Sequence, residues 1–456
     1  MSRWNLAWLL GLPAVCVVGL ALSYSAPSRE KDKDYELVRL LVDALDEVDR
    51  NYVRELDPVA KRKLVEDMIN GGLEHLDPHS SFMNPKEFKQ FNTASKGKFG
   101  GIGIQISTDR SSGALQVISP MVGTPAYEAG VIAGDVILKI DGKATDNMRL
   151  SEAVELIQGD AGTKITLTVM HEGSKEAVDL EMKRAVIEVH SVMGDVRKAD
   201  DPKEWDWFID KDQKIAYIRV SSFSENTTED LKKALEQVKK EGAKGLILDL
   251  RHNPGGLLSA AVEVSNFFVP EGKIVSTKGR NQKERVFEAK PGDLIMPAAD
   301  CPLVVLVNRY SASASEIVAA ALQDHKRAVI IGERSYGKGS VQNILKIEGD
   351  ASALKLTTAS YWRPSEKNIH RFPDSKETDE WGVTPNEGFA IKLSDEERLD
   401  YIVYRRDRDI IQGKPGAVPP PRPKTKDDKP EKEKKPYVDK VMEKALEHLR
   451  GQVAQK

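Results

Sequence analysis

The chain has 456 residues, enough for about three domains with sizeable hydrophobic cores. Its 68 basic and 71 acidic residues nearly balance, so the charge does not indicate a nucleic-acid partner or a generally basic surface. The two cysteines, Cys16 and Cys301, exclude a disulfide framework and a cysteine-based metal cluster.

An uncharged and mostly apolar segment, residues 6–22, follows Arg3 near the N-terminus. Such a segment is typical of a secretory signal or a short transmembrane anchor. The small residues Ser23 and Ser25 offer a cleavage site, and whether cleavage occurs stays open. We expect residues 1–26 to direct export, to the periplasm or the extracytoplasmic face of the membrane.

Residues 30–97 are predicted to form an N-terminal helical region. Apolar residues recur with helical spacing from Tyr35 to Leu76, and a turn follows. Within this turn, Asp77 and His79 raise the alternative of a Ser–His–Asp site. A turn with an Asp–Pro cap explains both residues better, so we assign them a structural role.

Residues 98–184 have the pattern of a compact module. The glycine turn GGIGI (100–104) enters a strand, GVIAGDVILKIDG follows at 130–142, an amphipathic helix is predicted at 150–157, and residues 164–170 alternate as a strand does. This order resembles a PDZ domain of the bacterial protease type. The resemblance implies that the glycine loop holds a C-terminal carboxylate and that the sheet edge adds the peptide as a strand. The expected peptide-binding residues are Gly101, Ile102, Gly103, Ile104, Val154 and Ile157.

Residues 185–412 return to an α/β pattern. Strands are predicted at 215–220 and 245–250, and the second strand leads through DLRHNPGG into a helix from Leu257. Glycines before a helix let backbone N–H groups face a ligand oxygen, as an oxyanion hole requires. An ordinary glycine turn is the alternative.

A nucleophile environment is predicted where a short β-branched strand, residues 303–307, ends before the run SASAS (311–315). A helix is predicted from Glu316, so these serines lie at a helix N-terminus, where backbone N–H groups favour developing negative charge. Helix capping alone is the simpler explanation of an isolated serine run.

Lys338 lies between two glycines, one helix and one strand after the serines. Close packing around it could desolvate its amine and make it a neutral general base, and Gln342 could hold this lysine or the substrate. Residues 332–338 also match the start of a phosphate-binding loop. Gly339 stands where that loop needs Ser or Thr, and a strand rather than a helix follows, so we exclude nucleotide binding.

Together, SASASEI, GKGSVQ and DLRHNPGG resemble the carboxyl-terminal processing proteases, which use a Ser–Lys dyad and carry an embedded PDZ domain. The resemblance implies an α/β multidomain fold: an α/β serine protease core with an N-terminal helical region and an inserted PDZ domain. It further implies Ser313 as nucleophile, Lys338 as base and Gln342 as the third member. The backbone amides of Gly255, Gly256 and Ala314 would form the oxyanion hole, and His252 and His325 are left as surface or loop residues.

We therefore expect an exported serine endopeptidase that captures protein C-termini through its PDZ domain and cleaves the tail. Its partners would be proteins with exposed C-termini, and the membrane if residues 1–26 are retained; no metal, organic cofactor or nucleic acid is implied, and homo-oligomerisation stays open. Residues 413–436 are predicted to be a Pro/Lys-rich linker before a C-terminal helix at 437–456. The alternative is a catalytically silent PDZ scaffold that binds protein tails at the membrane.

Overall fold

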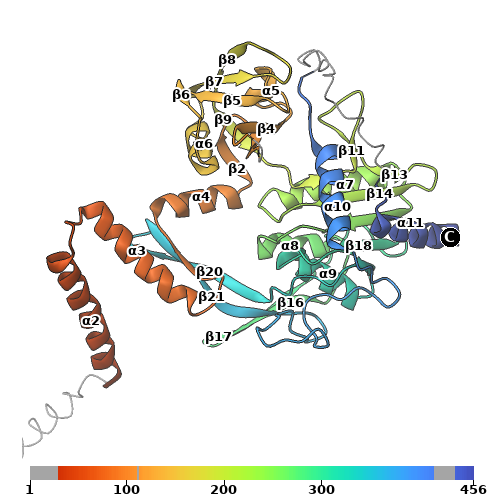
Figure 1. The fold of residues 1–456 in the computed structure, drawn as a ribbon. Helices are drawn as coiled ribbons and strands as arrows, with labels where there is room; N and C mark the ends of the chain where they lie inside the picture. The colour runs from red at the N-terminus through yellow and green to blue at the C-terminus, as the bar shows by residue number, and fades with distance from the viewer. Residues whose placement is uncertain (1–28, 110–111, 415–436, 456) are drawn as a thin grey trace, which may run out of the picture. The chain divides into compact units, whose positions relative to one another are not determined.

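The structure is a computed structural model that describes residues 29–109, 112–414 and 437–455 (Figure 1). The predicted signal or anchor segment, residues 6–22, lies outside the described residues, as does nearly all of the predicted linker. Within the described ranges, no helix is long and apolar enough to cross a membrane. The chain divides into two units, Met1–His75 and Leu76–Lys456.

The described part of the first unit, from residue 29 on, contains two helices, α2 (Arg29–Asn51) and α3 (Pro58–Glu74). The predicted helical stretch is thus broken once. Asp57 caps the second helix by accepting a hydrogen bond from the amide of Ala60 at 2.8 Å, and Pro58 occupies the first helical position.

In the second unit, residues 104–183 form an antiparallel sheet in the order β3-β4-β5-β7-β8, with β6 on β5. Its elements are β3 (Ile104–Thr108), β4 (Leu115–Pro120), α5 (Pro125–Glu128), β5 (Val136–Ile140), β6 (Lys143–Ala144), α6 (Leu150–Ile157), β7 (Lys164–Met170) and β8 (Ala177–Lys183). The predicted helix at 150–157 and the predicted strand at 164–170 have the predicted bounds. Strand β3 lies at the edge of this sheet, so its outer side can accept another strand.

The segments that enter and leave this module pair with each other. Strand β2 (Lys98–Gly101) is antiparallel to β9 (Ala185–Glu188), with Gly101 opposite Ala185. The module is therefore inserted into the rest of the chain through a two-stranded connection.

The α/β core is built on a sheet in the order β10-β14-β15-β18-β19, with β13 on β14. Strands β14, β15, β18 and β19 are parallel. The elements of this layer are β10 (Val192–Met193), β13 (Phe208–Asp210), β14 (Ile215–Val220), α7 (Thr227–Lys240), β15 (Gly245–Asp249), α8 (Leu258–Asn266), β18 (Leu303–Val307), α9 (Ala314–Asp324), β19 (Ala328–Gly332) and α11 (Lys440–Ala454). In β18, Val305 packs with α7, α8 and α9 while Val304 packs with α11, so both faces of the sheet are buried.

A second sheet has the order β1-β21-β16-β17, with β20 paired to β21 as a long antiparallel ribbon (Figure 1). Its strands are β1 (Ser81–Met83), β16 (Lys273–Gly279), β17 (Gln282–Glu288), β20 (Ser340–Ile347) and β21 (Ser352–Trp362). Strand β1 and helix α4 (Pro85–Ser95) contact β21, although both fall in the predicted helical region. A three-residue strand is too short to show the alternation by which a strand is predicted.

The remaining elements are the strand pair β11 (Val196–Arg197) and β12 (Trp205–Asp206), and helix α10 (Asp395–Asp409). Ser394 begins α10 with a capping box, accepting from the Glu397 amide at 3.1 Å while Glu397 accepts from the Ser394 amide at 2.7 Å.

Candidate active site

Two neighbouring parallel strands, β15 and β18, carry the predicted oxyanion loop and the predicted nucleophile loop. Asp249 pairs with Leu306, so both loops leave the same carboxyl edge of the sheet. Asn253 joins the loops, because its carbonyl oxygen accepts from the Ala312 amide at 3.0 Å and from the Ser315 hydroxyl at 2.9 Å.

The three serines of SASAS differ in the contacts that their hydroxyl groups make. Ser311 donates to the carbonyl of Leu250 at 2.8 Å and Ser315 donates to that of Asn253, and both side chains are fully buried. These two hydroxyls hold loops together. Ser313 instead has φ 55° at the start of α9, a left-handed conformation that is costly for a residue with a side chain. Such strain concentrates at functional sites, in keeping with Ser313 as the nucleophile.

Glu316 was not singled out by the sequence analysis, yet its buried carboxylate organises the site. Oε1 accepts hydrogen bonds from the Ser335 hydroxyl at 2.5 Å and the Gly337 amide at 2.6 Å. Oε2 accepts from the amides of Ser313 and Lys338, both at 2.8 Å. One carboxylate oxygen therefore brings the backbones of the predicted nucleophile and the predicted base together. Burial raises the pKa of Glu316 to about 7, although these four hydrogen bonds act in the opposite direction.

Lys338 lies in the loop between β19 and β20, and its side chain is partly buried. Burial lowers its pKa, and the positive charge of Lys355 lowers it further, while the charges of Glu316 and Asp77 oppose the shift. The flanking glycines permit this packing. A Cβ on Gly339 would come within 2.3 Å of the backbone nitrogen of His370. A Cβ on Gly337 (φ 87°) would come within 2.7 Å of the Arg371 Cβ.

Gln342 lies on β20, where its side-chain amide donates to Ser340 Oγ at 2.9 Å and to Thr357 Oγ1 at 3.0 Å. Strand β20 begins at Ser340, and its pairing with β21 shifts register between Val341 and Gln342. Because Lys338 precedes this strand, the alternation of side chains along β20 does not place Lys338 and Gln342 on the same face.

The predicted oxyanion donors lie against the nucleophile. A Cβ on Gly255 would come within 2.8 Å of the Ser313 Cβ, so this loop needs glycine. The Gly255 amide donates to Asn253 Oδ1 at 2.9 Å. In the part of the chain that the structure describes, the amides of Gly256 and Ala314 have no acceptor. These two amides are therefore the ones available to a substrate oxygen.

Tyr361 is a further residue at the site that the sequence analysis did not identify. It lies on β21, and its amide donates to the Gly339 carbonyl at 2.7 Å. Burial raises the pKa of its hydroxyl to about 12, and a hydrogen bond with Ser313 acts against that rise. A neutral phenol is thus positioned beside the predicted nucleophile.

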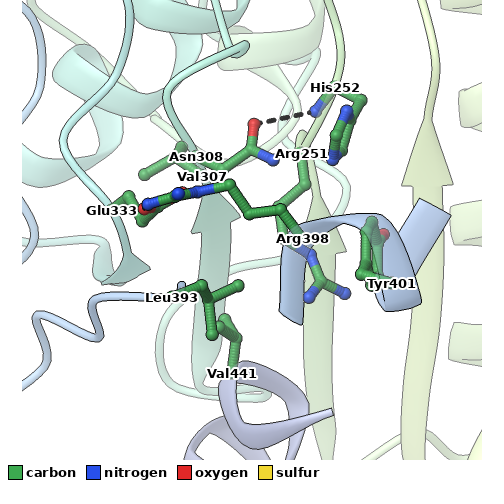
Figure 2. Close-up of a pocket in the computed structure, with 9 residues that line it drawn as sticks. All are labelled: Arg251, His252, Val307, Asn308, Glu333, Leu393, Arg398, Tyr401 and Val441. Atoms are coloured by element: carbon green, nitrogen blue, oxygen red, sulfur yellow. Dashed lines mark hydrogen bonds and ion pairs between the residues drawn. The ribbon is translucent and has the colours of Figure 1, made fainter. Parts of the chain in front are cut away.

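The two histidines considered as alternative bases have other contacts. The His252 ring stacks on the rings of Tyr310 and Tyr401, with centroid distances of 4.9 Å and 5.4 Å. The backbone amide of His252 donates to Asn308 Oδ1 at 3.0 Å (Figure 2). His252 faces a small cavity that Arg398 and Val441 also line. His325 ends α9 and contacts the Lys273 carbonyl through Nε2 at 2.7 Å. Neither of these sets of contacts includes a hydrogen bond from a histidine to Ser313.

A buried ion network holds the end of β15 in place. Arg251 donates to Asp249 Oδ2 at 2.7 Å and to Asp439 Oδ1 at 3.0 Å, and the Tyr217 hydroxyl donates to Asp249 at 2.8 Å. Asp439 also caps α11. The C-terminal helix, whose existence was predicted, thus reaches the loop that carries the oxyanion donors.

In the inserted module, the predicted peptide-binding residues differ in burial. Ile102 and Ile157 belong to the hydrophobic core, whereas Ile104 on β3 and Val154 on α6 are partly exposed. The carbonyl of Gly103 (φ 78°) accepts from the Met121 amide at 2.9 Å. The edge strand β3 and helix α6 are in contact, as a strand-addition groove requires.

Within the described residues, no group of three or more His, Cys, Asp or Glu side chains is arranged to hold a metal ion. Cys301 is buried, with its sulfur 3.6 Å from the Pro302 carbonyl oxygen, and Cys16 lies outside the described ranges.

Comparison with known proteins gives two family matches. Residues 214–387 match peptidase family S41, and residues 116–170 match the PDZ domain. The chain is 38% identical over 416 residues to the carboxy-terminal-processing protease of Bartonella bacilliformis, covering 88% of each chain. It is 33% identical to the carboxyl-terminal-processing protease of Synechocystis sp. over 84% of this chain and 86% of the relative. Among solved structures, it resembles a photosystem II D1 C-terminal processing protease at 30% identity, covering 77% of this chain and 92% of that one, with a TM-score of 0.42.

Proposed function

This chain belongs to the carboxy-terminal processing proteases of peptidase family S41, which are serine-type peptidases, and on that premise we propose that Ser313 and Lys338 form its catalytic dyad. The observation that carries the proposal is the carboxylate of Glu316, which binds the amides of both residues through one oxygen. The serines on either side of Ser313 have their hydroxyls bound to backbone carbonyls, so Ser313 is the one available for chemistry.

The reaction follows from the ionisation of Lys338. Burial and the charge of Lys355 lower its pKa, which favours the neutral amine that a general base must be. The amine takes the Ser313 hydroxyl proton as Oγ attacks the peptide carbonyl carbon. The resulting ammonium then gives this proton to the leaving amine as the C–N bond breaks. Water hydrolyses the acyl-enzyme by the same two proton transfers in turn.

The negative oxygen of the tetrahedral intermediate would be bound by backbone amides. Of the three predicted donors, Gly256 and Ala314 have amides without an acceptor among the described residues, while Gly255 already donates to Asn253. The N-terminus of α9 adds a favourable field at the same point. We therefore assign the two oxyanion hydrogen bonds to Gly256 and Ala314.

The dyad is tested with single alanine variants in the SASAS run. Ser313→Ala should lose fluorophosphonate labelling and casein degradation while keeping the wild-type melting temperature. Ser311→Ala and Ser315→Ala each remove a buried hydrogen bond, about 1 kcal/mol of stability, and should still be labelled. Loss of labelling in Ser311→Ala with labelling retained in Ser313→Ala would overturn the assignment. A catalytically silent scaffold, the alternative function, predicts no labelling of the wild-type protein.

We further propose that the PDZ domain captures the free C-terminus of a substrate protein. Support comes from the edge position of β3, to which an extended peptide can add as a strand, and from the glycine turn that precedes it. Val154 on α6 and Ile104 on β3 would contact the terminal side chain.

Export by residues 1–26 also forms part of the proposal, because an apolar segment behind Arg3 is typical of targeting signals. An alkaline-phosphatase fusion after residue 34 tests it. Activity in the fusion is expected, and an inactive fusion retained in the cytoplasm would contradict it.

A further inference from the structure

The turn that precedes β1 presents a carboxylate that can only accept hydrogen bonds. Asp77 Oδ1 accepts from the amides of His79 at 2.7 Å and Ser80 at 2.9 Å, and Oδ2 accepts from the Ser80 hydroxyl at 2.7 Å. Burial works to raise the pKa of Asp77, but these hydrogen bonds and one from Thr357 lower it below its ordinary value. The sequence analysis assigned this turn a structural role, which these contacts fit.

The same carboxylate also contacts β21, 280 residues away in the sequence. The Thr357 hydroxyl donates to Asp77 Oδ1 at 3.1 Å, and the Thr357 amide donates to the Ser80 hydroxyl at 3.0 Å. A hydroxyl has one proton to donate. Because an ionised carboxylate receives that proton, the Thr357 oxygen can offer only lone pairs to its other neighbours.

That restriction orients the side-chain amide of Gln342. Its Nε2 lies 3.0 Å from Thr357 Oγ1 and 2.9 Å from Ser340 Oγ. A flipped amide would place the Gln342 carbonyl oxygen against the Thr357 lone pairs, which is repulsive. The two N–H groups are therefore committed to Thr357 and Ser340, and Oε1 is directed to the other side of the amide.

We propose that Asp77 is a positioning residue for catalysis: acting through the Thr357 hydroxyl, it holds Gln342 so that Oε1 accepts a hydrogen bond from the amine of Lys338. This inference rests on the proposed dyad. A neutral lysine amine has two N–H groups and one lone pair. Donating one N–H to a fixed oxygen turns the lone pair toward the Ser313 hydroxyl, from which it must take a proton. The charge of Asp77 acts on Lys338, which places both groups in one cluster.

Thr357→Val tests the chain of hydrogen bonds with little change of shape. We expect kcat to fall about tenfold, as for loss of an orienting hydrogen bond, with KM nearly unchanged. Thr357→Ser restores the hydroxyl and should recover the rate. Thr358→Val is the matched control, because Thr358 accepts from the Asn343 side chain at 2.9 Å in an equivalent contact one residue along β21. Asn343 follows Gln342 on β20, so the two side chains point to opposite faces of that strand and this control should keep the wild-type kcat.

A double-mutant cycle separates positioning from general stability. In a Gln342→Ala background, Thr357→Val should cost nothing further in kcat, since its effect passes through the missing amide. Equal losses in the two backgrounds, or an unchanged kcat in Thr357→Val, would overturn the inference. The dyad is judged separately by Lys338→Arg. A dead Lys338→Arg enzyme with an additive cycle rejects the role of Asp77 alone, whereas an active Lys338→Arg enzyme rejects the dyad itself.

Discussion

Replacing Glu316 with glutamine should damage both the stability and the chemistry of this protease. The carboxylate accepts four hydrogen bonds, two on each oxygen. A glutamine side chain offers one accepting oxygen, and its NH2 group would face two donors. If the NH2 group faces the amides of Ser313 and Lys338, both lose their acceptor; if it faces the other pair, the Gly337 amide loses its acceptor and the Ser335 hydroxyl must turn to accept. The amides of Ser313 and Lys338 are the two donors to Oε2.

Each buried donor left without an acceptor costs about 1–3 kcal/mol, so Glu316→Gln, with one or two such donors, should lose about 1–6 kcal/mol of unfolding free energy. The rate should fall about a hundredfold, because a displacement near 1 Å between reacting groups has that effect. Protonation of Glu316 below its pKa of about 7 imitates this change in the wild type. The wild-type kcat/KM should therefore decline as pH falls through 7, and the variant should lack that decline.

Urea unfolding and the pH dependence of peptide cleavage measure the two effects. The matched control is Glu333→Gln, which removes a largely buried carboxylate that accepts from Arg398 at 2.6 Å but touches neither dyad amide. The control should lose stability and keep its pH profile. If Glu316→Gln cleaves at the wild-type rate with an unchanged profile, this carboxylate does not align the dyad.

Four further outcomes are expected. Lys338→Arg should be inactive, because guanidinium does not deprotonate near neutral pH, and near-normal turnover would mean that another group is the base. Lys355→Gln removes a positive charge that lowers the pKa of Lys338, so the rise of kcat/KM with pH should move to higher pH; a shift to lower pH would contradict the electrostatic argument. Gly339→Ala should displace the neighbouring lysine, since its Cβ would lie 2.3 Å from the His370 nitrogen, and a kcat/KM within twofold of wild type would refute that packing. Amidating a peptide's C-terminus should weaken its binding in a titration, and equal affinities would rule out capture of the carboxylate by the PDZ domain.

The elements predicted with near-correct bounds are those with local signals. Strand β18 is a continuous apolar run rich in valine, and α6 is amphipathic between turns, so both have the predicted bounds. Ser313 and Lys338 can be proposed from the sequence because their motifs are short and contiguous. Glu316 had a signal too: it follows Ser313 by three residues at a helix start, which is the spacing of a capping box, but only the serines were weighed.

Contacts between distant segments were not predictable from local pattern. Asp77 reaches Thr357 across 280 residues, and Tyr361 reaches Ser313 across two strands and a helix, so neither neighbour is visible in a sequence window. Likewise, nothing in the NPGG loop indicated that the Gly255 amide would donate to Asn253, since that depends on how the side chain turns back. Local sequence is thus enough to propose a nucleophile and a base, while the groups that contact them depend on tertiary structure.

The position of α11 affects the order in which the protein can fold. More than a hundred residues separate this helix from β19, yet it covers one face of the central sheet with Val441, Met442, Ala445 and Leu449. Asp439, its capping residue, also completes the charge balance of Arg251. A chain still being synthesised up to β19 would therefore leave that face exposed to water and that arginine without one of its two partners. Because such non-local contacts form late and slowly, cleavage activity should appear only after α11 has been made, which delays proteolysis until the whole catalytic core has assembled.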